Sequence, residues 1–367
     1  MRIGVNAALL GDRYYGVDSY ILGLIGCLAD LGHEVTVYTS SPRVPGGAQV
    51  KLRRSCKLLR FDKGPGASAL RFLWNQAVLP LRLIKDSIDV VFCQNIDAML
   101  RPPVSQILVI HDIIPLLYPE EAPGLHKYYK FVLPRTFRRA DALVTVSDTS
   151  RKDLIKCYGA AGAANICVGH EGVGSAVSNP AKDRKPSGFQ CQSFFLFVGT
   201  FCPRKNLATV IEALAMSGKE IGESLVVVAY ADKWMPAAMQ KIAELNVSER
   251  VVFLSDLQPE ELGYLYDHAT ALFLLSEYEG FGLPVLEAMS AGTPAVVSDT
   301  GALAEVVGDA AIKIKAHDVN AAAAIMSRLS VDQQFRQEWQ RKGLQRSRAF
   351  TWQRTGEQLA RLLQDFS

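Results

Sequence analysis

The sequence predicts an α/β protein built from two doubly wound parallel sheets, and two observations support this. Short apolar runs alternate with amphipathic stretches along the first half, which is the rhythm of β-α-β units. The rhythm stops in residues 178–188, a polar segment rich in turn formers, and then starts again. A chain of 367 residues with 49% apolar composition can bury two cores. We therefore expect two domains, residues 1–180 and 190–348, and a terminal segment, residues 349–367.

The expected strands are apolar runs, because strands of a parallel sheet are covered on both faces. In the first domain these runs are residues 3–7, 34–39, 90–93, 107–110 and 142–146, and the stretch 17–31 predicts the first helix. In the second domain they are residues 194–198, 224–229, 251–254, 271–275, 295–297 and 311–314, with helices at 207–216 and 236–245. Such domains bind ligands at the carboxyl ends of their strands, so we expect the reaction site in the cleft between them.

Composition excludes several classes of protein. No apolar run approaches the roughly 20 residues that cross a bilayer, and the chain begins directly with a strand, which predicts a cytoplasmic protein without a signal peptide. The seven cysteines form no CxxC pair and have no histidine at ligand spacing, which argues against zinc and against a disulfide framework.

Positive charge is concentrated in the first half of the chain. Residues 1–176 carry 21 Lys and Arg against 15 Asp and Glu, whereas the remainder carries 19 against 22. Within 51–85 the basic residues are Lys51, Arg53, Arg54, Lys57, Arg60, Lys63, Arg71, Arg82 and Lys85, beside an apolar face that includes Trp74. This segment fits the inner face of an anionic membrane or a phosphorylated lipid. It also fits a solvated helix that packs its apolar side on the sheet. We favour this second interpretation, because Pro80 interrupts the helical pattern.

Two glutamates, Glu279 and Glu287, have seven residues between them and follow the apolar run 271–275. Gly280 and Gly282 allow a tight turn, and Pro284 fits the first helical position. A strand end and a helix start therefore meet here, where backbone N–H groups can receive a diphosphate. Glu287 can accept hydrogen bonds from a ribose diol and Glu279 from a second sugar. The donor-binding residues expected in this segment are Glu279, Gly280, Phe281, Gly282, Leu283 and Glu287. Taken alone, the pair also fits a first-turn acid and a solvated loop charge.

The pair and the segments that follow it, 291–299 and 305–311, resemble the donor-site signature of the retaining GT-B glycosyltransferases of family 4. The match runs for more than thirty residues. The resemblance implies two Rossmann-like domains facing across a cleft, an N-terminal one for the acceptor and a C-terminal one for the nucleotide sugar. It also implies that the terminal helix, within 349–367, crosses back onto the first domain.

Arg204 and Lys205 lie in the loop between the run 194–198 and the next helix. Fixed cations there can stabilise the charge that develops on a departing nucleoside diphosphate. The resemblance implies that a lysine of this loop grips the diphosphate. Cys202 and Thr200 depart from the family pattern, which leaves open which of the two cations makes the main contact.

His111 follows the run 107–110, so its side chain is expected at the carboxyl end of a strand, with Asp112 either orienting it or capping the next turn. The resemblance implies that this histidine contacts the transferred sugar. Gly16 stands where the family has a glycine-rich turn, although Asp18 and Ser19 depart from the pattern. Gly16 therefore has one of two roles. It allows the backbone to approach the donor or the acceptor closely, or it is an ordinary turn residue.

A dinucleotide dehydrogenase is the competing class for this fold, but Gly11 and Gly16 do not form its GxGxxG motif. Asp-x-Asp metal motifs are absent from plausible loops, so we expect no metal and no cofactor beyond the nucleotide sugar. An inverting reaction would need a base such as Asp112. The resemblance implies retention instead, with His111, Glu279, Lys205 and Arg204 as the catalytic residues.

Residues 111–120, with Tyr128 and Tyr129 downstream, resemble bacterial mannosyltransferases that build O-antigen or capsular chains from GDP-mannose. A UDP-sugar donor stays open. The expected acceptor is a glycan or polyprenyl-linked saccharide, with no nucleic-acid partner. A sugar-nucleotide epimerase of the same fold and an inactive binding subunit are the remaining alternatives.

Overall fold

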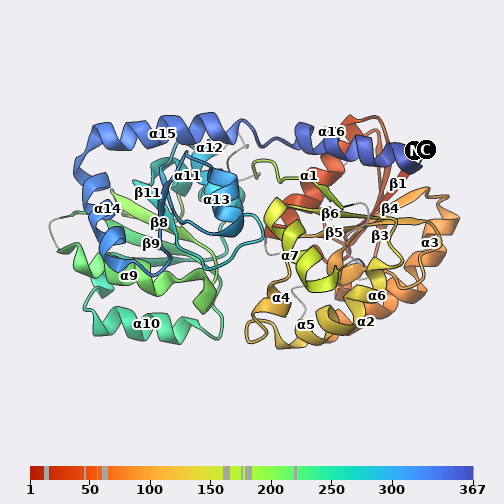
Figure 1. Cartoon of the computed structure of the whole chain (residues 1–367), viewed down its shortest axis with the longest axis horizontal. Helices are drawn as coiled ribbons and strands as arrows, with labels where there is room; N and C mark the ends of the chain where they lie inside the picture. The colour runs from red at the N-terminus through yellow and green to blue at the C-terminus, as the bar shows by residue number, and fades with distance from the viewer. Residues whose placement is uncertain are drawn as a thin grey trace. The chain divides into compact units, whose positions relative to one another are not determined.

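The computed structural model describes residues 1–11, 16–44, 47–55, 57–59, 65–159, 166–174, 177, 184–218 and 221–366. It divides into two compact units (Figure 1). The first comprises Met1–Gly172 and Thr351–Ser367, and the second Val173–Phe350. In the described part of the chain, the helices are all too short or too polar to cross a membrane.

The first unit contains a parallel sheet of seven strands in the order β3-β2-β1-β4-β5-β6-β7. Their bounds are β1 Arg2–Asn6, β2 Glu34–Thr39, β3 Val50–Arg54, β4 Val90–Gln94, β5 Ser105–Ile110, β6 Ala142–Thr145 and β7 Ile166–Val168. The strand order reverses between β1 and β4, so the loops after these two strands diverge to opposite faces of the sheet. A crevice forms at such a switch point, on the carboxyl edge of the sheet.

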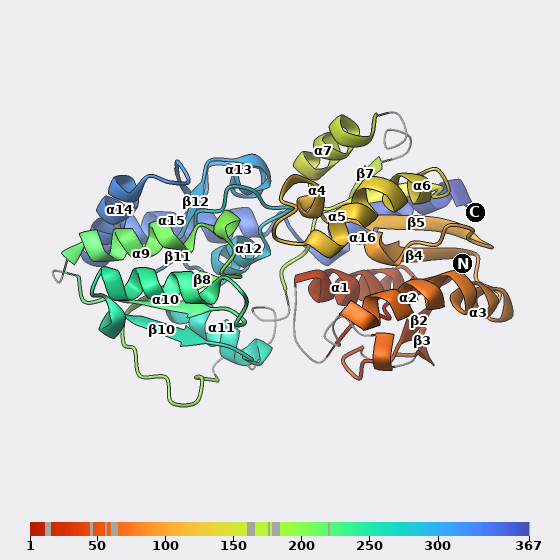
Figure 2. The same cartoon turned by 90° about the horizontal axis from the view of Figure 1, so that it is seen from below.

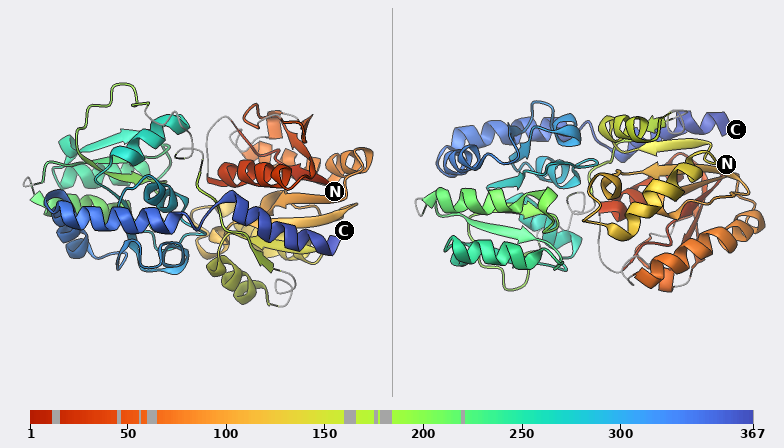
Figure 3. Two further views of the ribbon diagram at one scale, coloured as in Figure 1. Left: turned by 90° about the horizontal axis from the view of Figure 1, so that it is seen from above. Right: turned by 60° about the horizontal axis from the view of Figure 1, so that its bottom comes forward.

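Helices cover both faces of this sheet (Figures 1 and 2). Their bounds are α1 Gly16–Asp30, α2 Pro65–Ala77, α3 Leu79–Lys85, α4 Ile114–Leu117, α5 Pro123–Lys127, α6 Leu133–Phe137, α7 Asp148–Tyr158 and α16 Trp352–Leu363. The last helix, α16, packs along α1 (Figure 3). Thr351 caps the start of α16 by accepting a hydrogen bond from the Arg354 backbone N–H.

The basic segment 51–85 is the expected packed helix only in part, in α2 and α3, where Trp74, Leu79 and Leu83 are buried in the core. Its first part is β3, an exposed edge strand whose lysine and arginine side chains suit an edge that must not pair with another chain. Pro80 does interrupt the helical pattern, and α2 and α3 are separate helices on either side of Val78. Arg60 and Lys63 lie outside the described residues.

The second unit contains a parallel sheet of six strands in the order β10-β9-β8-β11-β12-β13. Their bounds are β8 Phe194–Val198, β9 Ser224–Val228, β10 Val251–Leu254, β11 Ala271–Leu274, β12 Ala295–Ser298 and β13 Ile312–Ile314. The order reverses between β8 and β11. The helices are α9 Leu207–Met216, α10 Met235–Glu244, α11 Pro259–His268, α12 Leu283–Ser290, α13 Gly301–Val307, α14 Val319–Val331 and α15 Gln333–Ser347. The two parallel α/β sheets confirm the fold class predicted from the apolar runs.

Candidate functional site

The loops after β8 and β11 meet at the switch point of the second unit. Asn206 joins them, because its side-chain amide donates to the backbone carbonyls of Leu275 and Ala316. Asn206 has a left-handed backbone with φ 54°, a conformation that asparagine tolerates better than most residues. Arg204 and Lys205 are therefore held next to the segment that begins at Leu275.

Lys205, Arg204 and Glu279 form a buried charged cluster at this point. Lys205 Nζ donates to Glu279 Oε1 at 2.6 Å, and Arg204 Nη1 lies 3.8 Å from Glu279 Oε2. Arg204 Nη1 also donates to the Tyr278 carbonyl at 2.5 Å. The Arg204 and Glu279 side chains are 6% and 9% exposed. The interpretation of Glu279 as a solvated loop charge is therefore wrong, and the cluster has two cations around one carboxylate.

The cations keep Glu279 ionised. Burial alone raises the pKa of a carboxyl group, but the charges of Lys205 and Arg204 and the hydrogen bond from Lys205 outweigh it, so the pKa of Glu279 is lowered. The cluster consequently carries a net positive charge, which suits a phosphate-bearing ligand.

Glu287 projects from the second turn of α12 and is 3% exposed. Tyr266 of α11 donates its hydroxyl proton to Glu287 Oε2 at 2.8 Å. α12 begins at Leu283, one residue earlier than expected, which places Pro284 at the second helical position. Gly282 precedes it with φ 107°, in the left-handed region that favours glycine.

The other residues expected in the donor segment are also placed by the structure. Phe281 is buried, with its ring 5.8 Å from that of Phe350. Gly280 lies in the same turn, between the end of β11 and the start of α12. In the first unit, Gly16 is the exposed first residue of α1 and has open space around the position of a Cβ atom. Packing therefore does not require glycine there; residues 12–15 of that loop lie outside the described residues.

His111 is buried just beyond β5, at the carboxyl edge of the first sheet. Its Nε2 lies 2.8 Å from Gln94 Oε1, and its Nδ1 lies 3.7 Å from Glu171 Oε1. The Tyr20 ring meets the His111 ring edge-on, with centroids 5.1 Å apart. Gln94 ends β4, so two neighbouring strands supply this pair.

Asp112 caps the turn after His111, since its Oδ1 accepts the Ile114 backbone N–H at 2.8 Å. This contact confirms the capping role expected for Asp112. Tyr128 and Tyr129, which follow α5, both contact Asn95. Tyr128 donates to the Asn95 carbonyl at 2.9 Å, and Asn95 Nδ2 donates to the Tyr129 hydroxyl at 2.5 Å.

A buried ion pair near this edge was missed at the sequence level. Arg71 Nε donates to Asp97 Oδ1 at 2.7 Å, with the two side chains 3% and 0% exposed. Asn75 also donates a hydrogen bond to Asp97, at 3.1 Å. Asn6, the last residue of β1, in turn donates a hydrogen bond to the side-chain oxygen of Asn75. Assigning Arg71 to a basic surface was therefore wrong. Polar residues that end apolar strands, such as Asn6 and Gln94, were the available signal.

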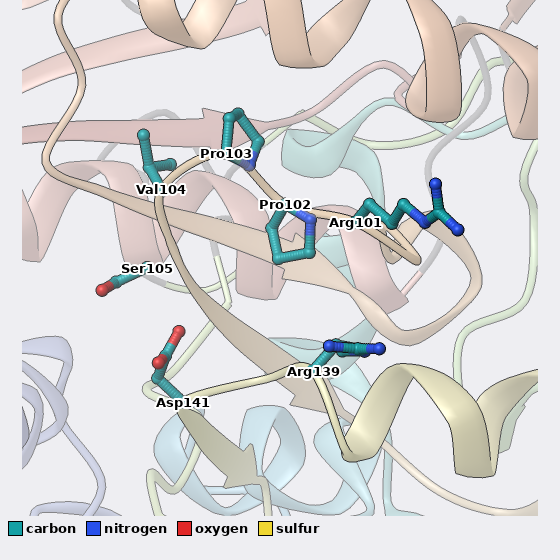
Figure 4. Close-up of a pocket in the computed structure, with 7 residues that line it drawn as sticks. All are labelled: Arg101, Pro102, Pro103, Val104, Ser105, Arg139 and Asp141. Carbon is teal, nitrogen blue, oxygen red and sulfur yellow. The ribbon is translucent and has the colours of Figure 1, made fainter.

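A hollow of about 680 Å³ lies at the opposite edge of the first sheet (Figure 4). It is lined by Arg101, Pro102, Pro103, Val104, Ser105, Arg139 and Asp141, at the amino ends of β5 and β6. Asp141 there accepts the Gln106 backbone N–H at 2.9 Å. Because the ligand sites of doubly wound sheets lie at the carboxyl edge, we assign the functional residues to that edge instead. Within the described ranges, no cluster of His, Cys, Asp and Glu could hold a metal ion.

Two doubly wound parallel sheets, one in each unit, are the architecture of the GT-B fold. Residues 178–346 match the family model for glycosyl transferases group 1, and residues 14–175 match the model for glycosyltransferase family 4. Together the two models cover most of the chain, which is therefore a glycosyltransferase with a family 4 domain followed by a group 1 domain.

Similar proteins support the assignment. An O-antigen chain mannosyltransferase B from Escherichia coli is 29% identical over 67% of this chain and 67% of its own length. An O-antigen chain mannosyltransferase RfbU from Salmonella typhimurium is 29% identical over 58% of each chain, so the match spans little more than half of that relative. The solved structure of a sucrose-phosphate synthase from Thermosynechococcus elongatus superposes with a TM-score of 0.81 over 100% of this chain and 98% of its own, at 18% identity.

Proposed function

We propose that this protein is a retaining, metal-independent glycosyltransferase that moves a hexose from a nucleotide sugar to a glycan or lipid-linked acceptor. The observation that carries the proposal is the buried cluster of Lys205, Arg204 and Glu279 at the switch point of the second sheet. Two fixed cations there stabilise the departing diphosphate more than the intact donor, which is what accelerates transfer. They also supply the charge that a metal ion would otherwise provide.

Within this proposal, Glu287 accepts hydrogen bonds from the ribose diol of the donor. Its carboxylate is already oriented by the Tyr266 hydroxyl. Glu279 orients Lys205 and binds hydroxyls of the transferred sugar, and Gly280, Phe281, Gly282 and Leu283 form the turn around the diphosphate. His111 binds a hydroxyl of the sugar.

GDP-mannose is the donor that we favour. The support is the similarity to O-antigen mannosyltransferases, at 29% identity, together with the His111 segment that resembles such enzymes. A UDP-sugar is the alternative donor. The decisive experiment is calorimetric titration of the protein with GDP, UDP and ADP, followed by a transfer assay with the sugar nucleotide of the preferred base.

We expect GDP to bind most tightly, and mannose to be transferred with its anomeric configuration retained. Treatment with EDTA should leave the rate unchanged. Failure to bind any nucleoside diphosphate would contradict the proposal. Release of a rearranged sugar nucleotide without an acceptor would show an epimerase instead.

We further propose that the first unit rests on an anionic membrane surface that carries the acceptor. The support is that segment 51–85 exposes both apolar and basic side chains, namely Leu58, Leu73, Leu81 and Ile84 with Lys51, Lys57 and Lys85. Vesicles containing an anionic phospholipid should sediment the wild-type protein. The variant Leu73→Ser/Leu81→Ser should stay in solution, whereas Leu344→Ser, which changes an exposed leucine of the second unit, should behave as wild type.

A further inference from the structure

Three buried polar atoms near His111 have no hydrogen-bond partner among the described residues. They are Tyr20 Oη, Gln94 Nε2 and Glu171 Oε2. Their residues are 0%, 1% and 5% exposed, so water does not freely satisfy them. A buried polar atom without a partner costs about 1–3 kcal/mol. Three such costs in one place indicate a ligand that supplies the missing partners.

The three residues form one cluster around the imidazole. Gln94 contacts His111 Nε2 at 2.8 Å and Glu171 lies 3.7 Å from Nδ1, while Tyr20 packs edge-on against the ring. Burial raises the pKa of the Tyr20 phenol, and the Glu171 carboxylate adds to this effect. Tyr20 therefore keeps its proton at neutral pH.

The hydrogen-bonding character of these atoms selects the ligand. The Gln94 amide nitrogen is a donor, a Glu171 carboxylate oxygen is an acceptor, and the Tyr20 hydroxyl can do both. A neutral hydroxyl group satisfies this set, because it can donate to Glu171 and accept from Gln94. An anion would be repelled by the buried Glu171 carboxylate. Since adjacent hydroxyls are the characteristic groups of sugars, the cluster suits a saccharide.

The backbone that carries Glu171 is fixed independently of any ligand. The Thr355 hydroxyl of α16 donates to the His170 carbonyl. A Cβ atom on Gly172 would lie 2.6 Å from the Trp352 backbone nitrogen, so α16 packs directly against this residue. Glu171 is thus presented to His111 from a rigid support, as a binding residue requires.

We propose that Tyr20, Gln94 and Glu171 form, together with His111, a subsite that binds a sugar hydroxyl, and that Glu171 positions the His111 ring. This inference rests on the proposed function and assigns it three further residues. The hydroxyl belongs either to the transferred sugar or to the acceptor, and kinetics distinguish the two. If the hydroxyl belongs to the donor, the variants weaken the affinity for the sugar nucleotide. If it belongs to the acceptor, they raise the KM for the acceptor.

The test uses Tyr20→Phe and Glu171→Gln, which preserve size and shape. Their matched controls are Tyr158→Phe, whose hydroxyl donates to the Tyr129 carbonyl, and Glu34→Gln at an exposed site of the same unit. Melting temperatures establish that each variant folds. Binding of GDP and GDP-mannose is measured by calorimetry, and transfer by steady-state kinetics with the wild-type acceptor. If UDP is the preferred base, UDP and its sugar replace the guanine pair.

We expect Tyr20→Phe to weaken substrate binding about tenfold and Glu171→Gln to weaken it about 10- to 100-fold. The effect should appear either as a lower contribution of the donor sugar to affinity or as a higher KM for the acceptor. The affinity for the bare nucleoside diphosphate should not change, and the controls should match wild type. With a substrate that lacks the bound hydroxyl, wild type and Glu171→Gln should bind equally well. The ¹⁵N shifts of His111 should also move in Glu171→Gln.

The inference fails if both folded variants transfer sugar with wild-type donor affinity and acceptor KM, because the three atoms then face only an ordered water. The proposed function would survive that result. Conversely, wild-type protein that binds no nucleoside diphosphate would overturn the proposed function first, before any variant is compared.

Discussion

Two lysine–glutamate pairs of the second unit have nearly the same length but different surroundings. Lys205–Glu279 spans 2.6 Å with side chains 12% and 9% exposed, and Lys241–Glu212 spans 2.7 Å with side chains 37% and 33% exposed. An exposed pair contributes little because water screens it, whereas a buried carboxylate that loses its partner is left without compensation. The chemistry of each residue is thus set by its burial.

The variant Lys205→Met should destabilise the second unit by about 3 kcal/mol at neutral pH, and Lys241→Met by less than about 0.5 kcal/mol. In the wild type, the lowered pKa of Glu279 gives stability that is complete at neutral pH and is lost as the pH falls through that lowered value. Without Lys205, less positive charge opposes the effect of burial, so the pKa of Glu279 is higher in the variant than in the wild type. The difference between Lys205→Met and wild type should therefore shrink as the pH falls from about 7 to 5, in urea unfolding. A difference independent of pH would contradict this account.

The Arg71–Asp97 pair leads to a second prediction of this kind. Burial raises the pKa of Asp97, although the charge and hydrogen bond of Arg71 and the Asn75 amide oppose it. The variant Arg71→Leu should therefore cost about 3–5 kcal/mol near neutral pH. Because Asp97 then binds a proton more readily when folded than when unfolded, that cost should rise with pH. The variant Arg2→Leu, which breaks a pair whose two side chains are 50% and 39% exposed, is the control and should change little.

The sequence predicted some of these residues for a physical reason and could not predict the others. His111, Glu279, Arg204 and Lys205 follow apolar runs, so their place at a strand end was readable. Glu171 follows β7, a strand of three half-buried residues with too little apolar character to stand out. Its approach to His111 is a tertiary contact across 60 residues of chain, and no local pattern encodes that.

The elements themselves were predicted well where an apolar run marks them, and this includes β10, which is only half-buried. The bounds expected for β2, β8, β10 and α9 agree with those observed. β3 was missed because its side chains are exposed and basic, and such a strand lacks the apolar run by which buried strands are recognised. Exposed edge strands are defined by their neighbours, in this case by pairing with β2.

The start of α12 depends on a glycine for two reasons. Gly282 has φ 107°, and a Cβ atom there would lie 2.6 Å from Leu303 Cδ2 of α13. The variant Gly282→Ala should therefore lose about 1–3 kcal/mol and displace the turn that holds Glu279. Nucleotide affinity should fall with it. Gly26→Ala in α1, where a Cβ has open space and φ is not positive, should be neutral or slightly stabilising. Equal effects in chemical denaturation would refute the argument.

At the scale of the whole molecule, the last helix belongs to the first unit although the second unit precedes it in the chain. Trp352 makes this attachment. A Cβ atom on Gly23 would lie 2.1 Å from the Trp352 ring, so only glycine leaves room for it on α1. Trp352 also meets the Tyr20 ring edge-on, at 5.5 Å, and Tyr20 in turn contacts His111. The C-terminal helix is thereby packed into the residues that surround the histidine.

Removing this side chain should accordingly affect one unit and spare the other. We expect Trp352→Ala to destabilise the first unit by about 2–4 kcal/mol, because it opens a cavity between Gly23 and Gly172. Hydrogen exchange measured by mass spectrometry should become faster in α1 and β7, with β8–β12 unchanged. Trp339→Ala in α15 should do the opposite, since that residue lies in the second unit. If Trp352→Ala accelerated exchange equally in both sheets, the helix would not be a part of the first unit alone.

The same variant should also change ligand binding, because Tyr20 loses a neighbour. Sugar-dependent binding should weaken. The affinity for the bare nucleoside diphosphate should stay at the wild-type value, since Lys205, Arg204 and Glu287 all lie in the other unit.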